Sequence, residues 1–307
     1  MADQPSPAPP RCGVIALLGA PNVGKSTLLN RLVGTKVSIV TAKVQTTRRR
    51  ILGITVQGAA QAVFIDTPGI FTPRPARQLE QAMVKAAWRG AEDADRCVLL
   101  IDAKRGIDRD TRTILDGLRA RSLRALLAIN KVDLVAPPKT LPLIAELDRT
   151  GLFDEVFIVS ALTGDGCDDL QARLLALLPE GPWLFPEDQL SDLSQRAMAA
   201  EITREKLFEQ LHQELPYSLT VGTEAWTEAP GGGEIRIDQT IYVERASQKA
   251  IVLGKGGRQI KAVGQAAREE LEQIVECRVH LFLYVKVRQR WTEDPERYRE
   301  LGIEFPG

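Results

Sequence analysis

The run G-A-P-N-V-G-K-S-T at residues 19–27 constrains the fold of this chain more than any other stretch. The apolar residues 14–18 before it are typical of a buried strand, and residues 27–33 after it have a helical pattern that ends at Gly34. The run fits G-x-x-x-x-G-K-[ST], the pattern of a phosphate-binding loop between a strand and a helix. Because glycines let the backbone curl there, successive N–H groups can face one anion beside the positive end of the helix. The sequence therefore predicts an α/β domain built around a phosphate-binding loop.

Two side chains of this loop carry specific predicted roles. Lys25 can reach the β- and γ-phosphates of a nucleotide, and the hydroxyl of Ser26 can ligate Mg²⁺. A glycine-rich turn that matches the pattern by chance is the alternative, and the predicted strand and helix on either side argue against it. The predicted phosphate-binding residues are Gly19, Ala20, Pro21, Asn22, Val23, Gly24, Lys25, Ser26 and Thr27.

A second motif, D-T-P-G at residues 66–69, follows a predicted strand hairpin. Residues 51–56 and 62–65 are its strands, and residues 57–60 form its turn. A carboxylate at a strand end beyond a phosphate-binding loop is placed to hold Mg²⁺, usually through water, so we assign this role to Asp66. Gly69 leaves its N–H available for a γ-phosphate, although a plain turn would explain the tetrapeptide taken alone. A polar, basic loop over residues 41–50 precedes the hairpin.

The third and fourth motifs predict a guanine pocket. Residues 97–101 and 125–129 are continuous apolar strands, typical of a sheet that is covered on both faces, with a helix predicted over residues 109–120 between them. The second strand ends in N-K-V-D, whose carboxylate can accept two hydrogen bonds from the N1–H and N2–H₂ edge of guanine, a donor pair that adenine lacks. The run S-A-L at residues 160–162 follows a predicted strand over residues 156–159, and its N–H groups can contact the guanine oxygen. The predicted guanine-binding residues are Asn130, Lys131, Asp133, Ser160 and Ala161.

The order of these motifs predicts more than any motif alone. Each follows a β-strand, and ligands collect at the carboxyl ends of the strands in an open α/β sheet. We therefore expect a GTP site on a mostly parallel sheet. The alternatives to the individual motifs, a surface turn at Asn130 and a loop that begins at Ser160, do not explain their common order.

Length and composition leave room for a second domain. The 307 residues suffice for two domains, and the chain is 44% hydrophobic and 26% charged with zero net charge, so a nucleic-acid site must be a local patch. The four cysteines are scattered and there are only two histidines, which argues against a disulfide framework, a zinc site or a histidine-based triad. No apolar run approaches the ~20 residues of a membrane span. We expect residues 1–10 to be a disordered, proline-rich tail and not a signal peptide.

The second half of the chain changes its order of elements. We expect a GTPase domain over residues 11–178, a linker over 179–198, an α+β domain over 199–290 and a tail over 291–307. The α+β domain is predicted to contain a helix (199–215), two strands (217–227 and 234–244), two helices and a last strand. The second of the two helices has apolar residues at helical spacing, and we expect it to bury Ile260, Val263, Ala267, Leu271 and Ile274.

A basic turn, G-K-G-G at residues 254–257, connects these two helices. Residues 245–268 around it contain six Lys and Arg and no acidic residue. Such a turn suits a nucleic-acid backbone, whereas a helix corner with solvated charges is the alternative. The predicted RNA-binding residues are Lys249, Gly254, Lys255, Gly256, Gly257, Arg258 and Lys261.

The motifs together resemble the Era family of GTPases, and the basic turn resembles the G-x-x-G loop of a type II KH domain. This resemblance implies hydrolysis of GTP to GDP and phosphate, and a cytoplasmic factor for assembly of the small ribosomal subunit. It also implies binding to the 3′ end of small-subunit ribosomal RNA and peripheral association with the inner membrane. The catalytic residues that it implies are Lys25, Thr47, Asp66 and Gly69, with Ser26, Thr47 and Asp66 around Mg²⁺ and Thr46 as the alternative to Thr47.

One departure bears on the rate of hydrolysis. Ile70 follows D-T-P-G where many GTPases carry a glutamine that positions the attacking water, so intrinsic turnover should be slow. Related GTPases with this departure use a potassium ion held partly by the asparagine of the phosphate-binding loop, which here is Asn22.

Two other classes of protein compete with a GTP-hydrolysing switch that gates RNA binding. An ATPase or nucleotide kinase is disfavoured by the N-K-V-D motif. A non-catalytic RNA-binding scaffold would hold GTP only as a structural ligand, and it would need no residue that senses the γ-phosphate, such as Thr47.

Overall fold

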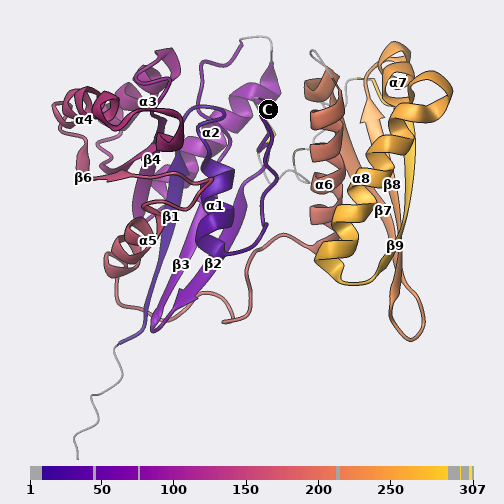
Figure 1. Ribbon diagram of the computed structural model, residues 1–307, viewed down its shortest axis with the longest axis horizontal. Helices are drawn as coiled ribbons and strands as arrows, with labels where there is room; N and C mark the ends of the chain where they lie inside the picture. The colour runs from indigo at the N-terminus through magenta and orange to yellow at the C-terminus, as the bar shows by residue number, and fades with distance from the viewer. Residues whose placement is uncertain are drawn as a thin grey trace, which may run out of the picture. The chain divides into compact units, whose positions relative to one another are not determined.

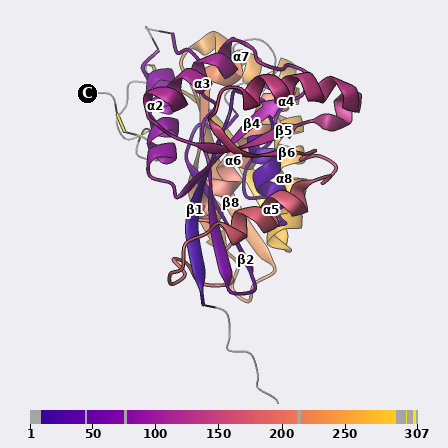
Figure 2. The ribbon, with the colours of Figure 1, turned by 90° about the vertical axis from the view of Figure 1, so that its left-hand side faces the viewer.

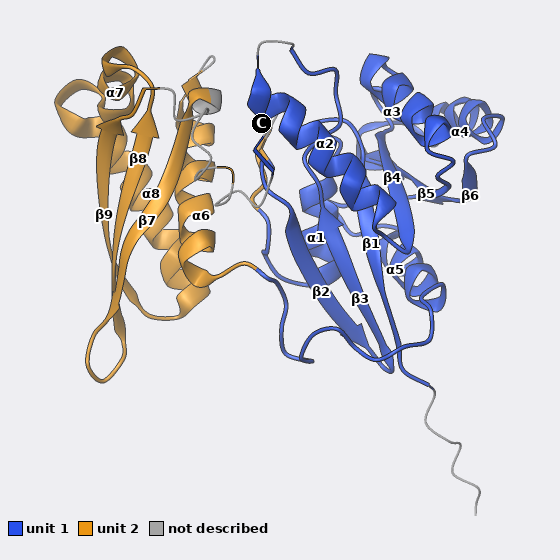
Figure 3. Cartoon of the chain, turned by 180° about the vertical axis from the view of Figure 1, so that it is seen from behind, with its two compact units in different colours: residues 1–38, 47–192, 301–307 blue, residues 39–46, 193–300 orange. Residues whose placement is uncertain are grey.

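The chain folds into two compact units in the computed structural model (Figure 3). The structure describes residues 9–43, 46–74, 77–211, 215–289, 298 and 304–305. The first unit contains residues 1–38, 47–192 and 301–307, and the second contains residues 39–46 and 193–300. Residues 1–8 of the tail expected at 1–10 lie outside the described residues, as does most of the tail expected at 291–307.

The first unit is built on a six-stranded sheet with the strand order β2-β3-β1-β4-β5-β6. Strand β2 runs antiparallel to β3, and every other neighbouring pair is parallel. The elements in chain order are β1 (Arg11–Leu18), α1 (Lys25–Val33), β2 (Ile51–Gln57), β3 (Ala60–Asp66), α2 (Gln78–Glu92), β4 (Arg96–Asp102), α3 (Arg109–Ala120), β5 (Ala125–Asn130), α4 (Thr140–Asp148), β6 (Phe153–Ile158) and α5 (Cys167–Ala176).

Helices cover both faces of this sheet, which explains why its central strands are apolar throughout. Helix α1 contacts α5, whereas the ring of Trp88 in α2 lies against Gly117 in α3. Figure 2 shows α2 and α5 on opposite sides of the strands. Leu17 in β1, Leu99 in β4 and Leu127 in β5 are fully buried between these layers. Burial on both faces is what a continuous apolar strand requires.

The second unit is a three-stranded sheet with its helices on one face (Figure 1). Strand β8 pairs antiparallel with β7 and parallel with β9. Helix α8 contacts both α6 and β9, and the apolar residues between these helices and the sheet form the core of the unit. The elements are α6 (Gln195–Gln210), β7 (Leu219–Glu228), β8 (Glu234–Val243), α7 (Ala246–Leu253), α8 (Arg258–Val275) and β9 (Arg278–Val287).

The sequence located most of these elements but misjudged some boundaries. Helix α6 begins four residues before the predicted start, because the side chain of Ser194 caps it by accepting from the N–H of Ala197. Ile274 was expected to be buried and is 42% exposed, whereas the next residue, Val275, packs against the core of the unit. Helices α2, α4 and α5 were not predicted. Among the described residues, no helix has the length and apolar character that crossing a bilayer needs.

The linker is attached to the first unit by a buried glutamine. The side-chain amide of Gln61 in β3 donates to the carbonyl of Phe185 at 2.8 Å and accepts from the N–H of Leu184 at 2.9 Å. The indole of Trp183 donates to Ala59. Farther along, the N–H of Ile54 in the edge strand β2 donates to Leu190. The linker therefore covers the edge of the sheet that β2 would otherwise leave unpaired.

Replacing Gln61 by leucine should release the linker. Leucine fills a similar volume but leaves the N–H and C=O groups of the linker without partners, at a cost of about 1–3 kcal/mol. We expect limited proteolysis within residues 182–192 to become faster and the denaturation midpoint to fall. The matched control is Gln57→Leu at an exposed position of β2. Equal proteolysis of the two variants would contradict the anchoring role of Gln61.

Candidate functional site

The phosphate-binding loop lies between the carboxyl end of β1 and helix α1, as predicted. Gly24 has a left-handed backbone with φ of 100°, and a Cβ at this position would stand 2.3 Å from the side-chain nitrogen of Asn130. A side chain is therefore excluded on two grounds, backbone strain and space. Lys25 curls back over the loop, where its ammonium donates to the carbonyls of Gly19 and Ala20 at 3.2 Å each.

Side chains from two neighbouring strand ends hold the next three carbonyls of the loop. Pro21 O accepts from Arg105 at 2.9 Å, Asn22 O accepts from Lys131 at 2.5 Å, and Val23 O accepts from Asn130 at 2.8 Å. In a trans peptide the C=O and N–H groups point in opposite directions. Since the carbonyls are held on one side, the following N–H groups are turned to the other, which is the arrangement that binds an anion.

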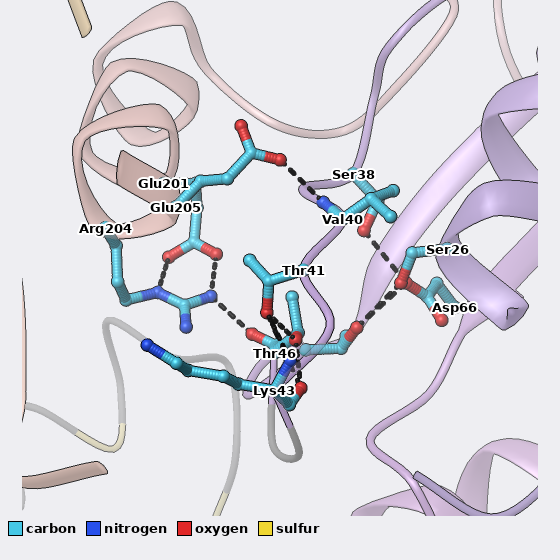
Figure 4. A network of polar contacts seen from close by, with 11 residues as sticks. Ser26, Ser38, Val40, Thr41, Lys43, Thr46, Asp66, Glu201, Arg204 and Glu205 are labelled. Atoms are coloured by element: carbon cyan, nitrogen blue, oxygen red, sulfur yellow. Dashed lines mark hydrogen bonds and ion pairs between the residues drawn. The ribbon is translucent and has the colours of Figure 1, made fainter. Parts of the chain in front are cut away.

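Asp66, at the end of β3, is the centre of the polar contacts in this site (Figure 4). Its Oδ2 accepts hydrogen bonds from the hydroxyls of Ser26 at 2.7 Å, Ser38 at 2.9 Å and Thr47 at 3.1 Å. Its Oδ1 is buried and has no hydrogen-bond partner among the described residues. Burial raises the pKa of Asp66, and the nearby Lys25 and the three hydroxyls oppose this shift. Burial also lowers the pKa of Lys25 to about 8, against the attraction of Asp66.

The residues around Asp66 fit a magnesium ion. The buried Oδ1 faces no protein donor among the described residues, and a carboxylate left in this state costs free energy unless a cation or water binds it. The hydroxyls of Ser26 and Thr47 lie 2.9 Å apart beside it, so three oxygen-bearing side chains from three segments converge. Mg²⁺ prefers such oxygen ligands and usually shares them with the phosphates of a nucleotide.

The predicted guanine residues are also brought together at the ends of β5 and β6. Asn130 is buried, and its Oδ1 accepts from the N–H of Ala161 at 2.9 Å. Asp133 is exposed and accepts from the hydroxyl of Ser160 at 2.6 Å. The N–H of Ser160 donates to Asp165. The N–H groups of Ser160 and Ala161, two of the three in the S-A-L run, therefore donate within the protein, and contact of this run with the guanine oxygen stays a prediction.

Three residues of the site were missed by sequence reasoning. Ser38 contributes a hydroxyl to Asp66, but it belongs to no motif. Asp102 ends β4, where its Oδ2 pairs with Lys131 at 2.8 Å. Arg105 follows three residues later and contacts the phosphate-binding loop. A polar residue directly after an apolar strand was the available signal for Asp102, because the carboxyl ends of parallel strands share one edge of the sheet.

Residues 39–46, which continue from Ser38, belong to the second unit, and helix α6 contacts several of the described ones (Figure 4). Glu205 accepts from the N–H of Val40 at 2.7 Å, and Lys43 donates to carbonyls at the end of the helix. Arg204 donates to the carbonyl of Thr46 at 2.6 Å and pairs with Glu201. Arg204 is almost completely buried. The residue before Thr47 is thus held by a helix of the second unit.

The second candidate surface surrounds the turn between α7 and α8. Gly256 and Gly257 have left-handed backbones with φ of 62° and 75°, and no atom lies within 4 Å of a Cβ at either position. Lys255, Arg258 and Lys261 are exposed around this turn. Arg268, by contrast, pairs with Glu272 at 2.9 Å and belongs to the surface of α8.

These features define a class of protein, a P-loop GTPase domain followed by a KH domain. Residues 14–131 match the family of 50S ribosome-binding GTPases, and residues 214–292 match the KH domain family. The curated relative GTPase Era of Afipia carboxidovorans is 58% identical over 298 residues, which cover 97% of this chain and 96% of the relative. GTPase Era of Rhizobium meliloti is 57% identical over 298 residues, which cover 97% of this chain and 94% of that relative. The chain belongs to the Era family of GTPases.

Solved structures of this family have the same fold. A crystal structure of Era in complex with MgGDPNP and nucleotides 1506–1542 of 16S ribosomal RNA is 40% identical, with a TM-score of 0.90, and covers 95% of this chain and 99% of that one. A single-residue variant of Aquifex aeolicus Era bound to GDP.AlF4- is 39% identical, also with a TM-score of 0.90 and the same coverage. The expected fold class and GTPase activity are therefore confirmed, and a GTPase excludes the ATPase and kinase alternatives.

Replacing Gly24 by alanine should weaken nucleotide binding strongly. The new Cβ collides with Asn130 and strains a left-handed backbone, and strain of this kind costs about 1–3 kcal/mol, which is roughly tenfold to a hundredfold in affinity. Titration with fluorescent GDP measures the effect. Gly58→Ala is the matched control, since Gly58 also has positive φ (61°) but no atom within 4 Å of a Cβ. Unchanged GDP affinity in Gly24→Ala would mean that the loop does not bind phosphate.

Proposed function

We propose that this GTPase binds the 3′ end of small-subunit ribosomal RNA through its KH unit and acts in assembly of the small ribosomal subunit. The observation that carries the proposal is the exposed basic turn at residues 254–257, where two glycines leave open space beside Lys255 and Arg258. A backbone phosphate can approach such a turn closely. The Era structure with 16S ribosomal RNA, whose fold this chain shares, supports the choice of RNA.

We assign the residues of this surface by their exposure and position. Lys255, Arg258 and Lys261 are exposed at the turn or in the first helical turn of α8, and Lys249 lies on α7. The glycines of the turn are Gly254, Gly256 and Gly257. The loop is proposed to clamp about four nucleotides of single-stranded RNA, as G-x-x-G loops do.

The catalytic assignment follows from the contacts of Asp66. We propose that Ser26, Thr47 and Asp66 hold Mg²⁺, which neutralises charge on the phosphates and leaves binding and orientation to the protein. Lys25 lies in the loop with its ammonium buried, where it can stabilise negative charge that develops on the γ-phosphate. The MgGDPNP of the related Era structure supports a magnesium-bound GTP substrate. Gly69 lies so close to Pro21 that a Cβ would not fit between them. We propose that the backbone N–H of Gly69 makes a further contact to the γ-phosphate.

The guanine assignment rests on the position of Asp133. Its carboxylate is exposed beside β5 and is oriented by Ser160, so it can accept from the guanine edge. Asn130 holds the phosphate-binding loop through Val23 and the S-A-L run through Ala161. We infer that Asn130 positions the two halves of the pocket, while Asp133 selects the base.

The position of residues 39–46 supports a switch over a passive scaffold. Thr47 contacts Asp66, and the preceding Thr46 is held by Arg204 of α6. Since the two threonines are joined by one peptide bond, we infer that a change in the contacts of Thr47 on nucleotide binding or hydrolysis reaches the residue that Arg204 holds. The alternative scaffold, which keeps GTP as a structural ligand, gives no reason for this connection. A cytoplasmic location and peripheral association with the inner membrane rest on the family resemblance and stay predictions.

Hydrolysis without the ribosome should depend on potassium. Ile70 is fully buried and has no polar side-chain atom for the attacking water, so charge that develops in the transition state must be stabilised by another group. We propose that K⁺ bound partly by Asn22 supplies this stabilisation. Multiple-turnover phosphate release should be severalfold faster in potassium than in sodium at equal ionic strength, and Asn22→Ala should remove the difference. Equal rates in both salts would contradict the potassium site.

Replacing Lys255 and Gly256 by aspartates should abolish RNA binding. Two carboxylates repel the phosphates that the turn must approach, so affinity should fall by more than about tenfold. Intrinsic GTP hydrolysis should remain nearly unchanged, since the nucleotide site lies in the first unit. Filter binding to a fragment from the 3′ end of small-subunit ribosomal RNA measures the first effect and phosphate release the second.

A matched control keeps the same change of charge elsewhere in the KH unit. Gly232 has φ of 77° with open space around it, and Arg278 is exposed beside the β7–β8 turn. Replacing both by aspartates should leave RNA affinity close to that of the parent. The RNA site would lie elsewhere if the control variant alone lost RNA affinity, or if the Lys255 and Gly256 variant bound RNA as tightly as the parent.

A further inference from the structure

Three consecutive carbonyls of the phosphate-binding loop each accept a hydrogen bond from a side chain, and only two of the donors belong to a GTPase motif. Lys131 and Asn130, which hold Asn22 O and Val23 O, come from N-K-V-D. The third donor is Arg105, whose Nη1 lies 2.9 Å from Pro21 O. Arg105 follows β4 and was not part of any predicted site.

The backbone that carries Arg105 is fixed by Asp102. One carboxylate oxygen of Asp102 accepts from the N–H groups of Lys104 at 2.9 Å and Arg105 at 3.2 Å, and Gly106 turns the chain with φ of 63°. The other oxygen pairs with Lys131. A single buried carboxylate therefore positions both the arginine and the lysine that contact adjacent carbonyls of the loop.

The guanidinium of Arg105 is oriented by a second carboxylate. It pairs with Asp108, whose other oxygen caps helix α3 by accepting from the N–H of Thr111 at 2.8 Å. Burial alone would raise the pKa of Asp108, but the Thr111 N–H and Arg105 outweigh it and lower the pKa. Arg105 is 41% exposed, so its position depends on these contacts and not on packing in a core.

The peptide that Arg105 holds matters because of the sequence of this loop. Pro21 has no N–H, so the loop lacks one of the donors that could face a phosphate. The next donor is the N–H of Asn22, which belongs to the same peptide as Pro21 O and points away from it. Asn22 itself has a left-handed backbone with φ of 65°, a conformation that asparagine adopts more readily than most non-glycine residues, and this backbone sets the direction of the peptide that Arg105 holds.

We propose that Arg105 is a positioning residue for GTP binding, which turns the N–H of Asn22 toward the phosphates by holding Pro21 O. It does not touch the nucleotide. Its effect should fall on the di- and triphosphate alike and should spare the choice of base, since Asp133 is in another part of the site. This inference rests on the proposed assignment of residues 19–27 as the phosphate-binding loop, which the Gly24→Ala variant tests separately.

The test compares Arg105→Ala and Arg105→Lys with Arg112→Ala in the full-length protein. Arg112 is exposed on the same helix, α3, that Arg105 approaches. Titrations with fluorescent GDP and GDPNP give affinities, competition with XDP gives base preference, and thermal unfolding without nucleotide reports on stability. We expect Arg105→Ala to bind both nucleotides about tenfold more weakly, as loss of a charged hydrogen bond to the loop implies, with unchanged base preference and unfolding temperature.

The lysine variant keeps one cationic donor and should bind GDP more tightly than Arg105→Ala. Arg112→Ala should behave as the parent. The inference is overturned if Arg105→Ala binds GDP as tightly as the parent does, or if the alanine and lysine variants bind GDP equally. It is also overturned if Arg105→Ala lowers the unfolding temperature without nucleotide, because the weaker binding would then reflect a less stable protein. If Gly24→Ala binds GDP as tightly as the parent does, the assignment of residues 19–27 as the phosphate-binding loop, on which the inference rests, is refuted instead.

Discussion

The buried carboxylate of Asp66 is the interaction on which the nucleotide site depends. One of its oxygens collects three hydroxyls, from α1, from the segment after α1 and from the segment before β2, while the other is buried without a donor among the described residues. Burial raises its pKa and therefore disfavours the charge that a metal site needs. A bound cation would lower the pKa of Asp66 again, because it favours the charged carboxylate. It would also compete with the carboxylate for the oxygen atoms of the hydroxyls. The arrangement is consequently one that a magnesium nucleotide would both stabilise and rearrange.

The same carboxylate gives the switch segment, residues 39–46, its position. Ser38 and Thr47, the residues on either side of this segment, both donate to Asp66, whereas Val40 and Thr46 within it contact α6. The segment itself belongs to the second unit, whose helix α6 holds Val40 and Thr46.

The sequence motifs pointed to residues that the structure brings together at the strand ends, whereas side chains outside any motif that lie beside them were missed. The phosphate-binding loop, Asp66 and N-K-V-D were recognisable because their chemistry requires particular residues at fixed spacing. Asp102 and Arg105 were not, because their role is visible only when β4 lies between β1 and β5 and brings them beside the loop. Ser38 likewise acquires its role from the path of the chain after α1. The position of residues 39–46 on α6 depends on contacts over about 160 residues, which no local pattern encodes.

The boundaries of elements were predicted less well for a related reason. The start of α6 is set by the cap at Ser194, and its predicted end at residue 215 extended an amphipathic pattern beyond Gln210, where the helix stops. Ile274 follows the helical spacing of the core residues of α8, yet it is exposed, and the adjacent Val275 packs against the core instead. The spacing of apolar residues therefore indicated both helices, but it did not give the capping residue of α6 or the side chain that packs at the end of α8.

The central claim, that Asp66 anchors a magnesium ion shared with the nucleotide, is tested most directly by the magnesium dependence of GDPNP affinity in the parent and in Asp66→Asn. Asparagine has nearly the same shape and can still accept from the hydroxyls, but it lacks the charge that holds the cation. The account predicts that GDPNP affinity rises with magnesium concentration in the parent and that this rise is largely lost in the variant. An equal rise in both proteins would contradict it.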